Sequence, residues 1–129
     1  MTITQIQKRI SQALESSNSQ GVNIAISIVD NGGNLVGFVS DPKCSYAVIK
    51  ASYKKAKTYG AFKIPTDIIG KIIESDPKLK AAFDDFKDIF YLGGELPILV
   101  DDEIIGGVGI ARGNSEQDKL VAQQSILNL

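Results

Sequence analysis

Residues 22–40 read VNIAISIVDNGGNLVGFVS and predict an antiparallel pair of strands. In residues 22–29 a large aliphatic side chain occupies every second position, which is the period of a strand with one face in a core. The next five residues, DNGGN, tolerate positive φ and predict a tight turn. Residues 35–40 then return as the partner strand, so a β-hairpin is expected near the start of the chain.

A second hairpin is predicted in the last third of the chain. Residues 96–100 are expected to form its first strand, Asp101 and Asp102 its turn, and residues 103–111 its second strand. Neither hairpin contains a connection long enough for a crossover helix. The sheet is therefore expected to be antiparallel, in a fold of the α+β class.

Helical spacing of apolar residues accounts for the segments around the hairpins. We predict helices over about residues 4–19 and 46–60, two short helices that begin at Thr66 and after Asp76-Pro77, and a C-terminal helix from Ser115. With the two hairpins, these segments make up one domain over residues 1–129.

The ends of the two longer helices carry recognisable signals. Thr4 with Gln7 has the spacing of a capping box, Ser45 can cap the second helix, and Gly60 is expected to end it. The face of the second helix that is expected to be buried comprises Tyr46, Ile49, Tyr53, Ala56 and Gly60.

Composition excludes several function classes. The 129 residues include 14 basic and 15 acidic side chains, so no strong electrostatic field favours binding to nucleic acid or to a membrane surface. The absence of histidine removes the commonest metal ligand and the usual neutral-pH general base, and the single Cys44 excludes an internal disulfide. Without a leader pattern or a long apolar run, a cytoplasmic protein is expected.

An ordered set of glycine motifs in the last third resembles a known family. The motifs are Gly93-Gly94-Glu95-Leu96-Pro97-Ile98, then Ile105-Gly106-Gly107-Val108-Gly109-Ile110, then Glu116-Gln117-Asp118. The Lys-Ala-rich segment around residues 50–58, the first helix and hairpin, and the total length agree with them. Together these features resemble the GlcG/HbpS-like family, sometimes labelled haem-degrading, which includes the C-terminal domain of PduO-type cobalamin adenosyltransferases.

The resemblance implies a profilin-like layered fold, in which a five-stranded antiparallel sheet is flanked by helices, and assembly into a homo-oligomer. It also implies a link to haem, a corrinoid or another tetrapyrrole. This chain departs from the family pattern because it has no histidine, and Ala111-Arg112-Gly113-Asn114 stands where small Ser-Gly-Gly residues are common. Only Tyr, Cys44, Lys or Met1 could ligate a haem iron here.

Gly107 and Gly109 share one face of the strand over residues 103–111, where a neighbour can approach the backbone closely. That neighbour is either a packed helix or a flat bound ligand. Arg112 and Gly113 follow directly and precede the C-terminal helix, so a guanidinium group and backbone amides could bind a carboxylate or phosphate. The alternative is a solvated loop with ordinary capping.

The second helix places cations beside aromatic rings. The lysines of this helix, Lys50, Lys54 and Lys57, run beside Tyr46, Tyr53 and Tyr59, an arrangement that suits the acid groups and the ring of a tetrapyrrole or a smaller aromatic acid. The alternative is a solvated lysine face bordering the core. Cys44, before this helix, is interpreted as a small structural residue in preference to a ligand or a nucleophile.

Paired carboxylates occur at Asp84-Asp85, Asp101-Asp102 and Glu116 with Asp118, and none of them is expected to be buried. Asp118 is assigned to a capping box with Ser115, and no metal site is predicted. The leading hypothesis is a small oligomeric protein that binds a tetrapyrrole or a small anionic ligand. The alternatives are an enzyme acting on a small carboxylate or aromatic substrate, and a structural subunit without a ligand.

Overall fold

The computed structural model describes residues 1–64, 66–85, 95–112 and 115–126. Its elements follow in the order α1 (Ile3–Gln20), β1 (Ala25–Asp30), β2 (Leu35–Ser40), α2 (Tyr46–Phe62), α3 (Thr66–Glu74), α4 (Pro77–Asp84), β3 (Glu95–Val100), β4 (Glu103–Ala111) and α5 (Ser115–Ser125). This order confirms both predicted hairpins and the α+β class.

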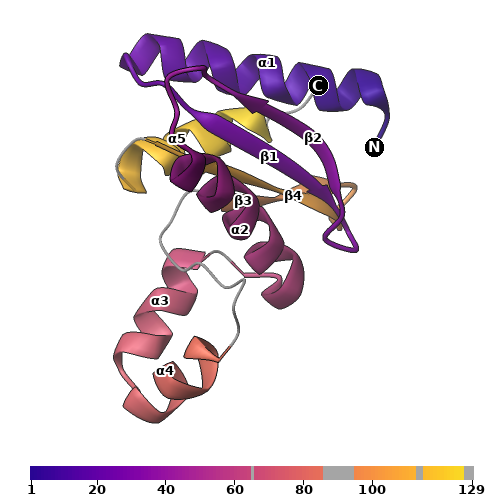
Figure 1. Ribbon diagram of the computed structural model, residues 1–129. Helices are drawn as coiled ribbons and strands as arrows, with labels where there is room; N and C mark the ends of the chain where they lie inside the picture. The colour runs from indigo at the N-terminus through magenta and orange to yellow at the C-terminus, as the bar shows by residue number, and fades with distance from the viewer. Residues whose placement is uncertain (65, 86–94, 113–114, 127–129) are drawn as a thin grey trace.

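The strands form an antiparallel sheet in the order β2-β1-β4-β3 (Figure 1). The two hairpins meet along β1 and β4, where Ile26 lies opposite Ile110 and Ile28 lies opposite Val108. β2 and β3 are the edges of the sheet.

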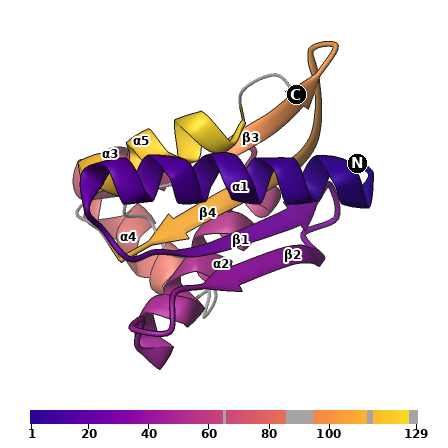
Figure 2. The same ribbon diagram turned by 90° about the horizontal axis from the view of Figure 1, so that it is seen from above.

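Helices cover both faces of this sheet. α1 and α5 lie side by side on one face, and α2 crosses the other (Figures 1 and 2). α3 and α4 extend beyond the end of α2, away from the sheet (Figure 1). The main core lies under α1 and α5 and comprises Ala13, Ile24, Ile26, Ile28, Ile98, Val108, Ile110, Val121 and Ala122.

The predicted turn between β1 and β2 is held by Asp30. Its Oδ1 atom accepts hydrogen bonds from the backbone N–H groups of Gly32 and Asn34, each at 2.9 Å. The bonds from Asn34 to the charged carboxylate are the main reason that the pKa of Asp30 is lowered. Gly33 adopts a φ of 82°, which is why a glycine suits this position.

Two expectations about the ends of helices were wrong. The capping box of α1 is formed by Thr2 and Gln5, because these two residues exchange hydrogen bonds at 2.8 and 3.1 Å, and Thr4 lies inside the helix. α2 continues past Gly60 to a left-handed cap at Lys63. Gly60 lies beside the hairpin turn, where a Cβ would make an ordinary contact of 3.5 Å with the Cα of Gly33.

The described residues form four strands, whereas the family resemblance implied five. Two hairpins account for all four, and the alternation in the sequence predicted no further strand. No described helix is long and apolar enough to cross a lipid bilayer.

The glycines of β4 give a direct test of the packing of α2. A Cβ at Gly109 would lie 2.6 Å from the backbone nitrogen of Ala56, whereas the nearest atom to a Cβ at Gly107 would be in the Tyr59 ring, at 3.2 Å. Gly109→Ala must therefore displace helix backbone, and we expect it to lower the free energy of unfolding by about 1–3 kcal/mol. Gly107→Ala is the matched control with a smaller loss, and equal losses in urea denaturation would contradict this geometry.

Candidate functional site

α2 contacts the sheet through a face that differs from the predicted one. Ser52, Lys55, Ala56 and Tyr59 are buried, whereas Tyr46 is 71% exposed. An α-helix has 3.6 residues per turn, so these positions lie on a face that is rotated about the helix axis from the predicted buried face. Of the four buried residues, only Ala56 was predicted to be buried.

Gly107 and Gly109 are covered by this buried face. A Cβ at Gly109 would collide with the carbonyl oxygen of Ser52, so the two backbones approach as closely as glycine allows. The neighbour that the glycines admit is thus a helix, one of the two alternatives considered. Their assignment to ligand binding stays a prediction that this contact does not support.

A buried ion pair joins three elements behind the glycines. Lys55 Nζ of α2 lies 2.9 Å from Asp118 Oδ2 of α5 and donates a hydrogen bond of 2.6 Å to the carbonyl oxygen of Ile110 in β4. Both side chains are at most 5% exposed. The expectation that Asp118 is an exposed capping residue was therefore wrong, because its carboxylate compensates a buried ammonium group.

Two further polar residues lie in the same layer. Tyr59 and Glu95 are 2% and 1% exposed, on α2 and β3 respectively. Burial, and then the negative charge of Glu95, raise the pKa of the Tyr59 hydroxyl above its ordinary value. Between α2 and β1, on the same side of the helix, the hydroxyl groups of Ser27 and Ser52 lie 2.8 Å apart.

Sequence reasoning missed this layer. Lys55 stands in a run of lysines that resembles a solvated face, and Glu95 lies within a glycine motif. The spacing of Ser52, Lys55 and Tyr59 could have indicated it, because residues three and four positions apart lie on the same face of a helix. This spacing places the charge of Lys55 on one face with a small residue and an aromatic residue.

The side of α2 that faces away from the sheet carries the predicted cationic and aromatic side chains except Tyr59, whose expected place beside the lysines was wrong because it is buried against the sheet. Lys50 Nζ lies 5.3 Å from the centre of the Tyr46 ring, and Lys57 Nζ lies 5.0 Å from the centre of the Tyr53 ring. Each pair spans one helical turn, and such contacts are typical cation–π interactions. Lys54 is half-buried beside them. We call Tyr46, Lys50, Tyr53, Lys54 and Lys57 the α2 stripe.

The predicted anion site is only partly described. Arg112 is exposed and has a φ of 117°, a conformation that is uncommon for a residue with a side chain. Gly113 lies outside the described residues, so its convergence with Arg112 stays a prediction. Cys44 is a half-buried free thiol just before α2.

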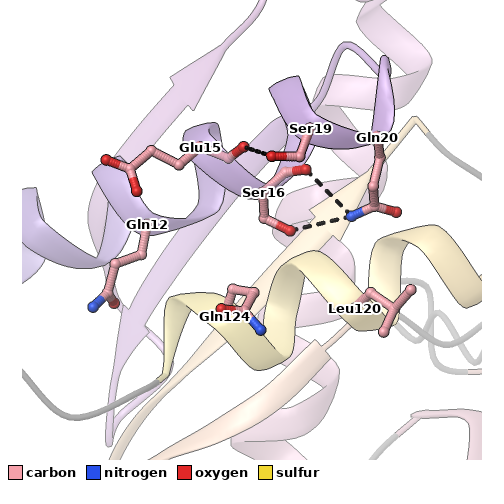
Figure 3. Close-up of a pocket in the computed structure, with 7 residues that line it drawn as sticks. All are labelled: Gln12, Glu15, Ser16, Ser19, Gln20, Leu120 and Gln124. Carbon is pink, nitrogen blue, oxygen red and sulfur yellow. Dashed lines mark hydrogen bonds between the residues drawn. The ribbon is translucent and has the colours of Figure 1, made fainter.

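A groove of about 550 Å³ lies between α1 and α5 (Figure 3). It is lined by Gln12, Glu15, Ser16, Ser19, Gln20, Leu120 and Gln124. The sequence did not point to it, because polar residues on amphipathic helices are expected to face solvent. Nearby, buried Arg9 donates a hydrogen bond of 3.2 Å to the carbonyl oxygen of Ser125, and burial lowers the pKa of its guanidinium group.

The comparison with known families matches almost the whole chain. The family described as "Haem degrading protein HbpS-like" matches residues 1–126. The chain belongs to the HbpS-like family. This confirms the resemblance inferred from the glycine motifs, which lie in and around β3, β4 and α5.

Related proteins share the fold at modest identity. A 15.0 kDa protein of Citrobacter freundii from the dhaT-dhaS intergenic region is 27% identical over 121 residues, or 92% of this HbpS-like chain and 85% of the relative. The crystal structure of a PduOC:haem complex aligns with a TM-score of 0.90 and 26% identity, over 98% of this chain and 92% of the other. Klebsiella pneumoniae protein ORFY aligns with a TM-score of 0.90 and 25% identity, over 98% and 88%.

The buried ion pair predicts a large asymmetry between single and double substitutions. Lys55→Met or Asp118→Leu alone leaves the other charge buried, and we expect each to lower the free energy of unfolding by about 3–5 kcal/mol. The double variant removes both charges and should lose less than the sum of the two.

The matched control is the exposed pair Lys80–Asp84, whose side chains are 54% and 46% exposed. Its removal should change stability by about 0–1 kcal/mol. Urea denaturation measures all four variants. Equal effects at the buried and the exposed pair would contradict a structural role for Lys55.

Proposed function

We propose that this HbpS-like protein is a small accessory protein that binds a tetrapyrrole acid, with haem as the representative ligand, on the α2 stripe. The observation that carries the proposal is the pair of lysine-on-tyrosine contacts on the outward face of α2. This surface combines cations with aromatic faces one helical turn apart.

The chemistry of the stripe suits the parts of a haem molecule. Lys50, Lys54 and Lys57 offer ammonium groups to propionates, and the rings of Tyr46 and Tyr53 offer apolar faces and phenol oxygens. Of the axial ligands open to a chain without histidine, this surface carries tyrosine and lysine, and we expect a tyrosine phenolate to be the ligand. When bound, haem would supply a redox-active iron.

The comparisons support the class of ligand. A protein that is 26% identical to this chain and shares its fold was solved as a haem complex, and the family description refers to haem. Two of the lysines that the sequence pointed to, Lys50 and Lys57, contact tyrosine rings of the same helix, and this supports the proposed site.

A surface stripe leaves one side of a bound ring exposed to water. We infer that a second copy of the chain covers it, because large apolar side chains remain exposed. On the edge strand β2, Leu35, Val36 and Phe38 are 39–45% exposed, and on the α3 side Ile64, Ile68 and Ile72 are 36–46% exposed. Exposed apolar clusters of this kind commonly mark interfaces.

Haemin titration tests the ligand. We expect a saturable absorption change with features of tyrosinate ligation, because phenol groups are the oxygen ligands of the stripe. Lys50→Ala with Lys54→Ala should weaken binding about fivefold through loss of two propionate contacts. The control is Lys8→Ala with Lys78→Ala, which removes two exposed lysines from α1 and α4. A non-saturating titration, or equal weakening by both double variants, would overturn the proposal.

Sedimentation equilibrium tests the second copy. We expect a mass of at least two chains at micromolar concentration, reduced towards the 13.9 kDa monomer by Phe38→Glu, since a charge on an apolar edge opposes strand contact. Leu99→Glu on the opposite edge strand β3 is the matched control. A monomer for the unmodified protein would contradict self-association.

A further inference from the structure

The groove between α1 and α5 lies on the face of the sheet opposite α2, so it is separate from the α2 stripe (Figures 1 and 3). Five of its lining residues come from α1, and Leu120 and Gln124 come from α5. The groove therefore depends on side chains that α1 and α5 bring together across a distance of about a hundred residues in sequence.

Two hydrogen-bond donors of the groove, on Ser19 and Gln20, are used within α1. Ser19 Oγ donates to the carbonyl oxygen of Glu15 at 3.0 Å, and Gln20 Nε2 donates to Ser16 at its Oγ, 3.1 Å, and its carbonyl oxygen, 3.4 Å (Figure 3). A ligand that enters the groove could use these two donors only by breaking a hydrogen bond within α1.

Acceptors, in contrast, are left over. Gln12 Oε1 is buried without a hydrogen-bond partner among the described residues, which is a costly arrangement for an amide oxygen. The terminal amide of a glutamine rotates about its last bond, so an entering N–H group can recruit this oxygen. Glu15 adds a carboxylate that takes part in neither of the ion pairs Lys55–Asp118 and Lys80–Asp84.

Charge and apolar surface narrow the ligand class. Neither lysine nor arginine lines the groove, so Glu15 leaves it with a negative charge that disfavours phosphates, carboxylates and tetrapyrrole acids. Leu120 is 51% exposed and offers an apolar wall. A carboxylate, a free amide oxygen and an apolar side chain together suit a cation with several N–H groups and a methylene chain.

We propose that the α1–α5 groove binds a linear alkylammonium ion of the polyamine class. An ammonium group pairs with the Glu15 carboxylate, further N–H groups use the amide oxygens of Gln12 and Gln124, and the methylene chain packs on Leu120. This site goes beyond the proposed function and does not depend on it.

Isothermal titration with spermidine at low ionic strength tests the site. We expect saturable binding to one site per chain, weakened about tenfold by Glu15→Gln through loss of the charge-assisted contact. Glu103→Gln removes the same charge from the exposed start of β4 and should leave the affinity unchanged. Gln12→Met, which is similar in volume, should weaken binding by a smaller factor because it removes the unpaired oxygen.

Three outcomes would overturn the proposal. They are a titration that does not saturate, equal weakening by Glu15→Gln and Glu103→Gln, and spermidine binding that only accompanies dissociation of an oligomer. The last would identify the groove as a contact between copies. Haemin titration of Glu15→Gln should match that of the unmodified protein, so failure of this site and failure of the α2 stripe are distinguishable.

Discussion

The close approach of α2 to β4 over Gly107 and Gly109 is the constraint on which the rest of the structure depends. Because no side chain separates the two backbones there, the stem of Lys55 is held against β4. Its ammonium group then reaches the Ile110 carbonyl and Asp118, and this pair attaches α5 to the other side of the sheet. An unpaired buried charge is costly, so the helix position and the ion pair support each other.

The same contact determines which side chains of α2 face outward. With Ser52, Ala56 and Tyr59 against the sheet, helical geometry leaves Tyr46, Lys50, Tyr53 and Lys57 on the outward side. The candidate ligand surface is thus a geometric consequence of glycines on a neighbouring strand.

Alternating aliphatic residues and turn signals predicted both hairpins, since residues 22–40 and 96–111 satisfy their backbone groups locally. The buried face of α2 could not be predicted in this way. Its sequence contains lysines and tyrosines at several helical positions, and the choice among them depends on which strand residues lack a Cβ. Asp118 was misjudged for a similar reason, because its partner Lys55 is 63 residues away in the chain. The groove depends on α1 and α5 together, which no local pattern encodes.

The two proposed ligand surfaces differ in charge, although the chain as a whole carries a net charge of −1. The α2 stripe exposes ammonium groups over aromatic rings, whereas the α1–α5 groove exposes acceptors around Glu15. The sheet keeps these surfaces apart, and the Lys55–Asp118 pair that links the layers is neutral as a whole. Screening over about 8 Å at physiological ionic strength further isolates the two surfaces. The two proposed ligands, an anionic tetrapyrrole and an organic cation, would therefore not compete for the same charges.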